Sequence, residues 1–212
     1  MISKPVLFSS WIALLSACLL IGFTPGAGAI NTMNNALRVG FHRALWGILG
    51  QQAALLIQLA IVAAGLGLVI ANSPTAFAVI RYCGAAYLVY LGIGQIRAGR
   101  DDDPATTDFK AGPATPWSMF TRGVWVNLLN PKAIVFLLAF IPGFVRPERD
   151  LLVQYGIIAV TIVTVDVVVM WLFFATLGKS FARFAATDRG RRGLGWLFGL
   201  LFIAVGVMLA VL

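Results

Sequence analysis

Charged side chains are scarce in this sequence. Only 11% of its 212 residues are Asp, Glu, Lys or Arg, whereas a soluble globular domain carries about 25%. Hydrophobic residues make up 60% of the chain, and its mean hydropathy is +0.91. This composition excludes an ordinary soluble fold. It indicates an all-α membrane protein that crosses the bilayer several times.

Metal ligands and nucleophiles are also few. The chain has one histidine, His42, and two cysteines, Cys18 and Cys83, which cannot supply the usual four ligands of a structural zinc site. We therefore predict no metal and no cofactor. Both cysteines fall in apolar segments, where we expect buried thiols. A membrane-embedded hydrolase needs a nucleophile with a base, a carboxylate pair or metal ligands, so we predict that the protein is not an enzyme.

Six apolar runs are present instead, most of them long enough for the ~20 residues that a helix needs to cross a bilayer. They cover residues 6–23, 46–71, 76–96, 123–145, 151–177 and 194–212. The first run also resembles a signal peptide, but it is longer than the ~7–15 apolar residues of a typical one. We predict six transmembrane helices in a single transmembrane domain, residues 1–212.

Pro25 and Pro131 lie 106 positions apart, which is half the chain length. Each follows a residue suited to cap a helix, Thr24 or Asn130, and proline favours the first helical position because it lacks an N–H group. We predict that one helix ends and another begins at each proline. In lipid such a break is tolerated only where it lines a protein cavity. Breaks at corresponding positions of two halves point to the substrate site of a transporter.

The same offset relates whole spans. Shifting the second apolar run by 106 residues gives 152–177, which is nearly the fifth run. Because each half then holds an odd number of spans, the second half must enter the membrane from the opposite side. We predict two inverted three-helix repeats, residues 1–96 and 118–212, joined by a polar cytoplasmic linker over residues 97–117.

The basic residues divide unevenly between the two sides of this arrangement. Twelve of the 16 fall on one side: Arg38, Arg43, Arg97, Arg100, Lys110, Arg122, Lys132, Lys179, Arg183, Arg189, Arg191 and Arg192. The other four are Lys4, Arg81, Arg146 and Arg149. The positive-inside rule places the richer side in the cytoplasm and both termini outside. The net charge of +8 thus reflects topology and attraction to anionic lipid, and we predict no binding of nucleic acid.

Asp166 is the only one of the eight acidic residues that lies in the middle of an apolar run. A carboxylate at membrane depth costs about 2.5–3.5 kcal/mol unless it is protonated, paired or hydrated. We therefore predict that Asp166 couples transport to protons. The alternative is a structural aspartate, protonated or hydrogen-bonded between helices.

Lys132 is the second residue of the helix predicted to start at Pro131. A cation there opposes the positive end of the helix dipole, so it needs an anion nearby. The candidates are Asp166, a lipid phosphate, or a substrate carboxylate held by the N–H groups at the two helix starts. The alternative is a lysine that extends to the cytoplasmic interface.

Three motifs resemble the lysine exporter family, in particular its homoserine, threonine and leucine exporter branch. They are Thr24-Pro25-Gly26, the sequence IRYCGAAYLVYLG at 80–92, and NLLNPKA at 127–133. The resemblance implies a secondary transporter of the bacterial inner membrane that exports amino acids or related small metabolites by proton antiport. Together with the two breaks, it predicts a substrate site made of Thr24, Pro25, Gly26, Asn31, Asn127, Asn130, Pro131 and Lys132.

The chain departs from the family pattern near the first break. Ala27 and Gly28 stand where members usually carry a second proline and an asparagine, and Gln51 and Gln52 occupy positions that are usually small and apolar. The substrate can therefore differ. A passive channel or a structural subunit of a membrane complex is the alternative function, and neither needs a titratable residue such as Asp166. The expected partners are a small-molecule substrate, membrane lipid and a second copy of the chain in a homodimer.

The charge distribution gives a topology that can be tested. We expect a tag inserted near Thr107 to be cytoplasmic and tags near Pro147 and after Leu212 to be external. Protease protection in spheroplasts and in inverted vesicles measures this. Tags at Thr107 and Pro147 on the same side would exclude both the orientation and the inverted repeat.

Overall fold

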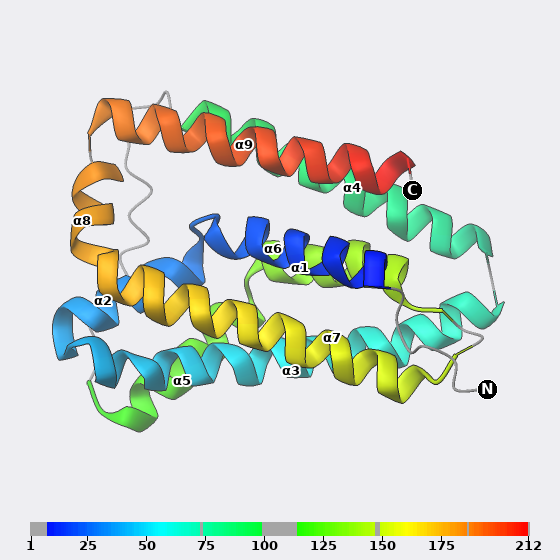
Figure 1. Cartoon of the computed structure of the whole chain (residues 1–212), viewed down its shortest axis with the longest axis horizontal. Helices are drawn as coiled ribbons and strands as arrows, with labels where there is room; N and C mark the ends of the chain where they lie inside the picture. The colour runs from blue at the N-terminus through cyan, green and yellow to red at the C-terminus, as the bar shows by residue number, and fades with distance from the viewer. Residues whose placement is uncertain (1–7, 73, 99–113, 147–148, 186, 212) are drawn as a thin grey trace.

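The computed structural model describes residues 8–72, 74–98, 114–146, 149–185 and 187–211, which are almost entirely helical and contain no strand. The elements in chain order are α1 (Phe8–Phe23), α2 (Ala27–Val39), α3 (Phe41–Asn72), α4 (Pro74–Ala98), α5 (Pro116–Leu128), α6 (Pro131–Phe140), the 3₁₀ helix η1 (Ile141–Phe144), α7 (Leu151–Val168), the π-helix η2 (Val169–Ala175), α8 (Thr176–Ala185) and α9 (Asp188–Val211). The long helices run side by side, and α8 crosses one end of the bundle (Figure 1).

The break at Pro131 has the predicted form. Helix α5 and the segment α6–η1 are bent by 55° relative to each other. Pro131 is the first residue of α6, and the Asn130 side chain accepts a hydrogen bond from the Lys132 backbone N–H at 3.1 Å. Asn130 is therefore an N-cap followed by proline, a combination that reduces the number of unmet N–H groups at a helix start.

The first break is present but differs in detail. Helices α1 and α2 are bent by 57°, yet α2 begins at Ala27 with Gly26 as its N-cap, and Gly26 has no side chain to cap it. The prediction that Thr24 caps this helix is wrong, because its hydroxyl donates to the Leu20 carbonyl of α1 at 2.8 Å. Pro25 thus lies inside the break and does not start the helix.

Three segments are long and apolar enough to cross a membrane on their own, and they are Phe41–Gly65, Leu151–Ala175 and Asp188–Val207. The count reaches five if each bent pair is one span, which agrees with a membrane protein of several spans. The predicted span 76–96 corresponds to α4. The six-span count and the inverted repeat therefore stay predictions. Residues 99–113 of the predicted linker lie outside the described residues.

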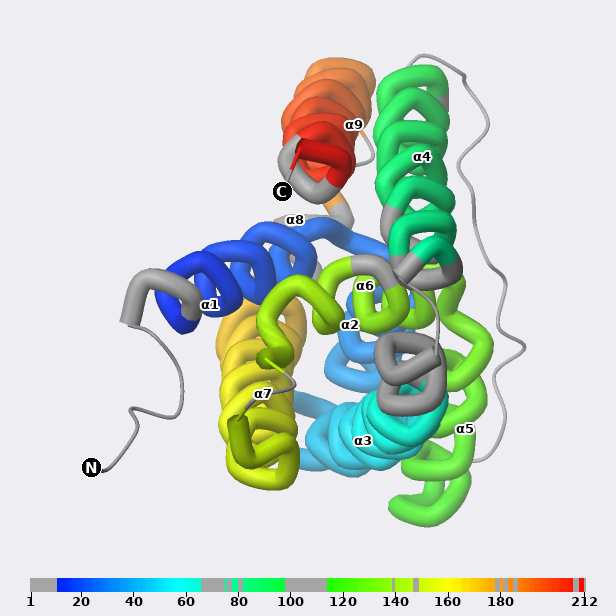
Figure 2. The backbone as a smooth tube through the Cα atoms, turned by 90° about the vertical axis from the view of Figure 1, so that its right-hand side faces the viewer, coloured from blue at the N-terminus to red at the C-terminus, as the bar shows by residue number. Residues whose placement is uncertain are grey.

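Glycines bring two helix pairs into backbone contact. Helix α3 lies beside α5, and α4 lies beside α9 (Figure 2). A Cβ atom on Gly50 would overlap the Phe120 carbonyl oxygen, and one on Gly123 would overlap the Gly47 carbonyl oxygen. Small residues allow such close approach in membranes, where apolar burial alone does not drive helices together.

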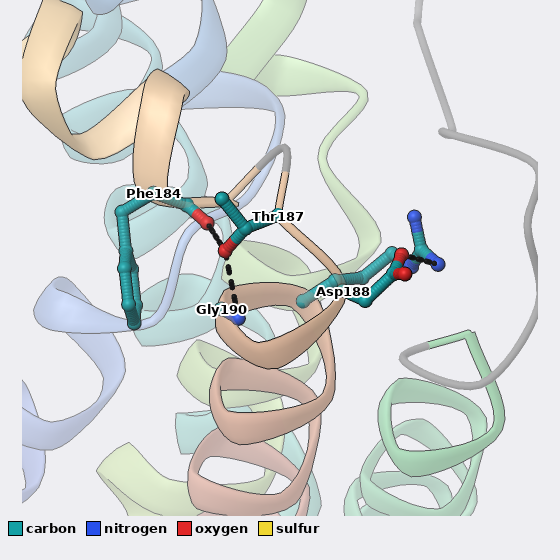
Figure 3. Close-up of polar contacts among 5 residues, drawn as sticks. Phe184, Thr187, Asp188 and Gly190 are labelled. Carbon is teal, nitrogen blue, oxygen red and sulfur yellow. Dashed lines mark hydrogen bonds and ion pairs between the residues drawn. The ribbon is translucent and has the colours of Figure 1, made fainter.

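The α8–α9 turn is fixed by a side-chain cap (Figure 3). The Thr187 hydroxyl donates to the Phe184 carbonyl at 2.7 Å and accepts from the Gly190 N–H at 3.1 Å, while Asp188 pairs with Arg191 at 2.9 Å. This turn lies at the same end of the bundle as the α2–α3 junction and the start of α5 (Figure 1). These segments contain most of the twelve basic residues that the sequence places in the cytoplasm.

The two cysteines have different environments. Cys18 is buried in α1 as predicted, whereas Cys83 is exposed on α4 and the expectation of a buried thiol there is wrong. In a membrane protein the lipid-facing side of a helix is as apolar as the side that packs inside the bundle. An apolar run therefore does not indicate which of its residues face lipid.

The glycine contacts predict a position-dependent effect of one methyl group. Gly123→Ala should lower the stability by about 1–3 kcal/mol, because the new Cβ meets the α3 backbone and not a movable side chain. Gly156→Ala in α7 is the control, since nothing lies within 4 Å of a Cβ there and alanine favours a helix by about 1 kcal/mol. Thermal unfolding in detergent measures both. Equal effects would mean that α3 and α5 do not touch at Gly123.

Candidate functional site

A cavity of about 50 Å³ lies against both helix breaks. Helices α1, α2, α3, α5, α6 and α7 and the π-helix η2 all contribute to its wall. The lining residues are Cys18, Ile21, Gly22, Gly28, Ala29, Gln51, Leu55, Asn127, Asn130, Lys132, Ala133, Phe136, Ile162, Asp166 and Met170. The cavity has room for only about three to five water molecules, and it is the place where both halves of the chain meet.

The Lys132 ammonium group binds the end of α1. Its Nζ donates to the Thr24 carbonyl at 2.7 Å and to the Ile21 carbonyl at 3.0 Å. These carbonyls stand at the C-terminal end of α1, where the helix has no donors of its own and its dipole is negative. The observed hydrogen-bond partner of Lys132 is therefore the negative end of another helix, which was not among the three predicted anions. These bonds hold the Lys132 side chain against α1 inside the bundle, and its assignment to the cytoplasmic side of the membrane stays a prediction.

The end of α5 is satisfied in a parallel way. The Gln58 Nε2 group, from α3, donates to the carbonyls of Asn127 and Leu128, both at 3.1 Å. Gln58 is buried. Because no water reaches such carbonyls in a bilayer core, each needs an internal donor. At both breaks a long side chain from a different helix supplies it.

Amide side chains connect the remaining walls of the cavity. Asn127 donates to the Gln51 carbonyl at 2.9 Å, and Asn130 donates to the Asn127 side-chain oxygen at 3.4 Å. The Gln51 side chain in turn donates to the Gly28 carbonyl and to the Thr32 hydroxyl, both at 3.2 Å. Gln51 thus joins α2 to α3, and Asn127 joins α5 to α3.

Asp166 reaches the cavity from α7. One carboxylate oxygen accepts a hydrogen bond of 2.5 Å from Gln52 Nε2. The other oxygen has no hydrogen-bond partner among the described residues. Lys132 lines the same cavity, and its ammonium group lies close enough to interact electrostatically with Asp166. Asp166 therefore has a neutral hydrogen-bond partner in Gln52, a cation nearby in Lys132, and one oxygen that is able to bind a proton or a ligand.

The structure brings most of the predicted site residues together. Asn127, Asn130, Lys132 and Asp166 line the cavity. The Thr24 carbonyl accepts a hydrogen bond from the Lys132 Nζ group. Gly26 lies beside the same side chain, since a Cβ atom added there would be 3.4 Å from Nζ.

The other three predicted residues do not line the cavity. Pro25 and Pro131 form the breaks, and Asn31 is buried further along α2. Gln51, Gln52 and Gln58 are not among the predicted site residues, although all three are buried and hydrogen-bonded here. The available signal was three glutamines within one apolar run, since each is costly in lipid unless it has a partner.

Comparison with known proteins gives a consistent result. Residues 12–212 match the family described as LysE type translocator. A homoserine/homoserine lactone efflux protein of Salmonella typhimurium is 40% identical over 203 residues, which cover 96% of this chain and 97% of the relative. An uncharacterized membrane protein of Vibrio cholerae is 34% identical, over 94% and 96%. A leucine efflux protein of Klebsiella pneumoniae is 26% identical, over 96% and 95%. No solved structure matches the chain.

The Lys132 contacts predict a stability effect. Lys132→Met should lower the stability by about 1–2 kcal/mol, because the Ile21 and Thr24 carbonyls lose their donor where water is absent. Arg189→Met, which removes an exposed basic side chain at the end of the bundle, should have little effect. Unfolding of the purified variants in a denaturing detergent series measures the difference. Unchanged stability of Lys132→Met would show that the contacts with α1 do not hold the fold together.

Proposed function

Because this chain belongs to the LysE type translocator family of membrane transport proteins, we propose that it is a bacterial inner-membrane exporter of amino acids that exchanges substrate for protons. One observation carries this proposal. Asp166, the acidic residue at membrane depth, lines a cavity that is walled by both helix breaks and by both halves of the chain. In this proposal both termini are external and the basic loops are cytoplasmic.

An amino acid has two charged groups, and the cavity offers a place for each. The ammonium group of the substrate would pair with the Asp166 carboxylate, one oxygen of which accepts no hydrogen bond from the described residues. The carboxylate would face the start of α2, where Gly26 provides no side-chain cap and Gly28 and Ala29 line the cavity. N–H groups at a helix start bind anions. The start of α6 is less suitable, because Asn130 already accepts from its Lys132 N–H.

Competition at Asp166 would couple the two fluxes. When the cavity opens to the outside, a proton that binds Asp166 neutralises the carboxylate and releases the ammonium group of the substrate. When the cavity opens to the cytoplasm, the proton leaves and a new substrate binds. Intramembrane carboxylates serve as proton carriers in pumps and transporters in this way.

Homoserine is the first substrate to test. The Salmonella typhimurium relative at 40% identity is named for efflux of homoserine and its lactone, and the Klebsiella pneumoniae relative at 26% is named for leucine. Both are small amino acids without net charge. Since the cavity has room for only a few water molecules, it must widen when it accepts either molecule.

Replacement of Asp166 tests the coupling. Asp166→Asn keeps the size and can still bind Gln52 but cannot titrate, so we expect it to abolish homoserine efflux driven by a pH gradient. Counterflow of labelled homoserine between vesicle and medium, which needs no gradient, should survive. Asp188 is an exposed acidic residue at the start of α9, so Asp188→Asn is the matched control. This variant should export homoserine at the rate of the unmodified protein.

Two results would contradict the proposal. Gradient-driven efflux by Asp166→Asn at the rate of the unmodified protein would make Asp166 structural. Homoserine flux through the unmodified protein that ignores the pH gradient would favour a passive channel.

A further inference from the structure

Two asparagines of α2 are buried without partners. Asn31 is 2% exposed and Asn35 is 3% exposed, and the side-chain nitrogen of each makes no hydrogen bond to any described residue. They are one helical turn apart and so lie on the same face of α2. Their neighbour Asn34 is exposed on another face. A buried amide without a partner is unfavourable, so a fold would not retain two of them for stability.

Both amides point at a glycine of the neighbouring helix. A Cβ atom on Gly47 of α3 would overlap the Asn35 side-chain nitrogen and would lie 3.5 Å from that of Asn31. On its other side, Gly47 contacts Gly123 of α5 through its carbonyl oxygen. The absence of a side chain at Gly47 therefore leaves the two amides facing bare backbone between α2 and α3.

This seam between α2 and α3 leads from the cavity to the end of the bundle. Gly28, in the first turn of α2, lines the cavity. Asn31 and Asn35 follow along the helix, and α2 ends at Val39, at the basic end of the bundle where α3 begins (Figure 1). In the present conformation the seam is held closed by Gln51 of α3, which donates to the Gly28 carbonyl and the Thr32 hydroxyl.

We propose that the seam between α2 and α3 is the route by which substrate enters from the cytoplasm, and that the Asn31 and Asn35 amides are its first binding groups. This proposal rests on the proposed function as an exporter. The two N–H donors would bind an oxygen acceptor at the carboxyl end of an amino acid. The substrate would thus supply the hydrogen bonds that the closed seam lacks.

Neutral donors also suit the chemistry of the relatives' substrates. An amide N–H can donate a hydrogen bond to a carboxylate oxygen or to an ester carbonyl. A cationic side chain, by contrast, favours the charged carboxylate. Lys132, the cation at the cavity, already donates to two carbonyls of α1. A route lined by amides can therefore accept an amino acid and its lactone alike.

Leucine substitutions separate this role from a structural one. In inverted vesicles, Asn31→Leu and Asn35→Leu should each raise the KM for labelled homoserine about tenfold, the equivalent of one lost hydrogen bond. The thermal stability of both variants should stay equal or rise, because an unmet buried amide has been removed. Asn34→Leu, at the exposed neighbour, is the matched control and should change neither quantity. An unchanged KM, or a marked loss of stability in either buried-site variant, would overturn the proposal.

Thiol labelling tests the route without relying on transport. In a Cys83→Ser background, Asn35→Cys should react with a membrane-impermeant thiol reagent in inverted vesicles and not in right-side-out vesicles. The Cys83→Ser protein alone gives the background from buried Cys18. Reaction only from the outer face, or from neither face, would exclude the seam as a cytoplasmic route. If the unmodified protein transports neither homoserine nor leucine, the proposed substrates are wrong. The labelling result still shows whether the seam between α2 and α3 opens to the cytoplasmic face.

Discussion

The structure depends on how it satisfies backbone groups where membrane helices are interrupted. A helix that stops inside a bilayer leaves carbonyl groups that water cannot reach. Here α1 and α5 both stop in this way, and each end is met by a long side chain from another helix, Lys132 for α1 and Gln58 for α5. Because these donors come from distant parts of the chain, the two breaks hold the helices in one arrangement, and the cavity between them follows from it.

Local signals predicted the elements well. Composition indicated an all-α membrane protein, and Pro25 and Pro131 located both breaks, because proline acts on its own backbone and its immediate neighbours. The Asn130 cap was also predictable. The Thr24 cap was not, since a threonine hydroxyl can bind either a following N–H or the carbonyl four residues earlier, and the sequence does not decide between them.

Long-range partners could not be predicted. Lys132 was expected beside an anion, whereas its hydrogen-bond acceptors are neutral carbonyls of α1, one of them 108 positions away. Asp166 was identified as the acidic residue of the site, whereas its partner Gln52 lies 114 positions away on α3. Such pairings follow from how the helices pack, and packing between apolar helices leaves little trace in their composition.

The charged side chains and the helix ends at the two breaks also determine the net charge around the cavity. When Asp166 is ionised, it and Lys132 carry opposite unit charges. The helix ends at the two breaks contribute about half a charge each, negative for α1 and α5 and positive for α2 and α6, so the whole set sums to roughly zero. An electrically neutral chamber of this kind gains nothing from a molecule with net charge, and a cationic or anionic side chain would leave a charge without compensation. With Asp166 ionised, a zwitterion therefore suits the charge balance of this cavity better than a molecule with net charge.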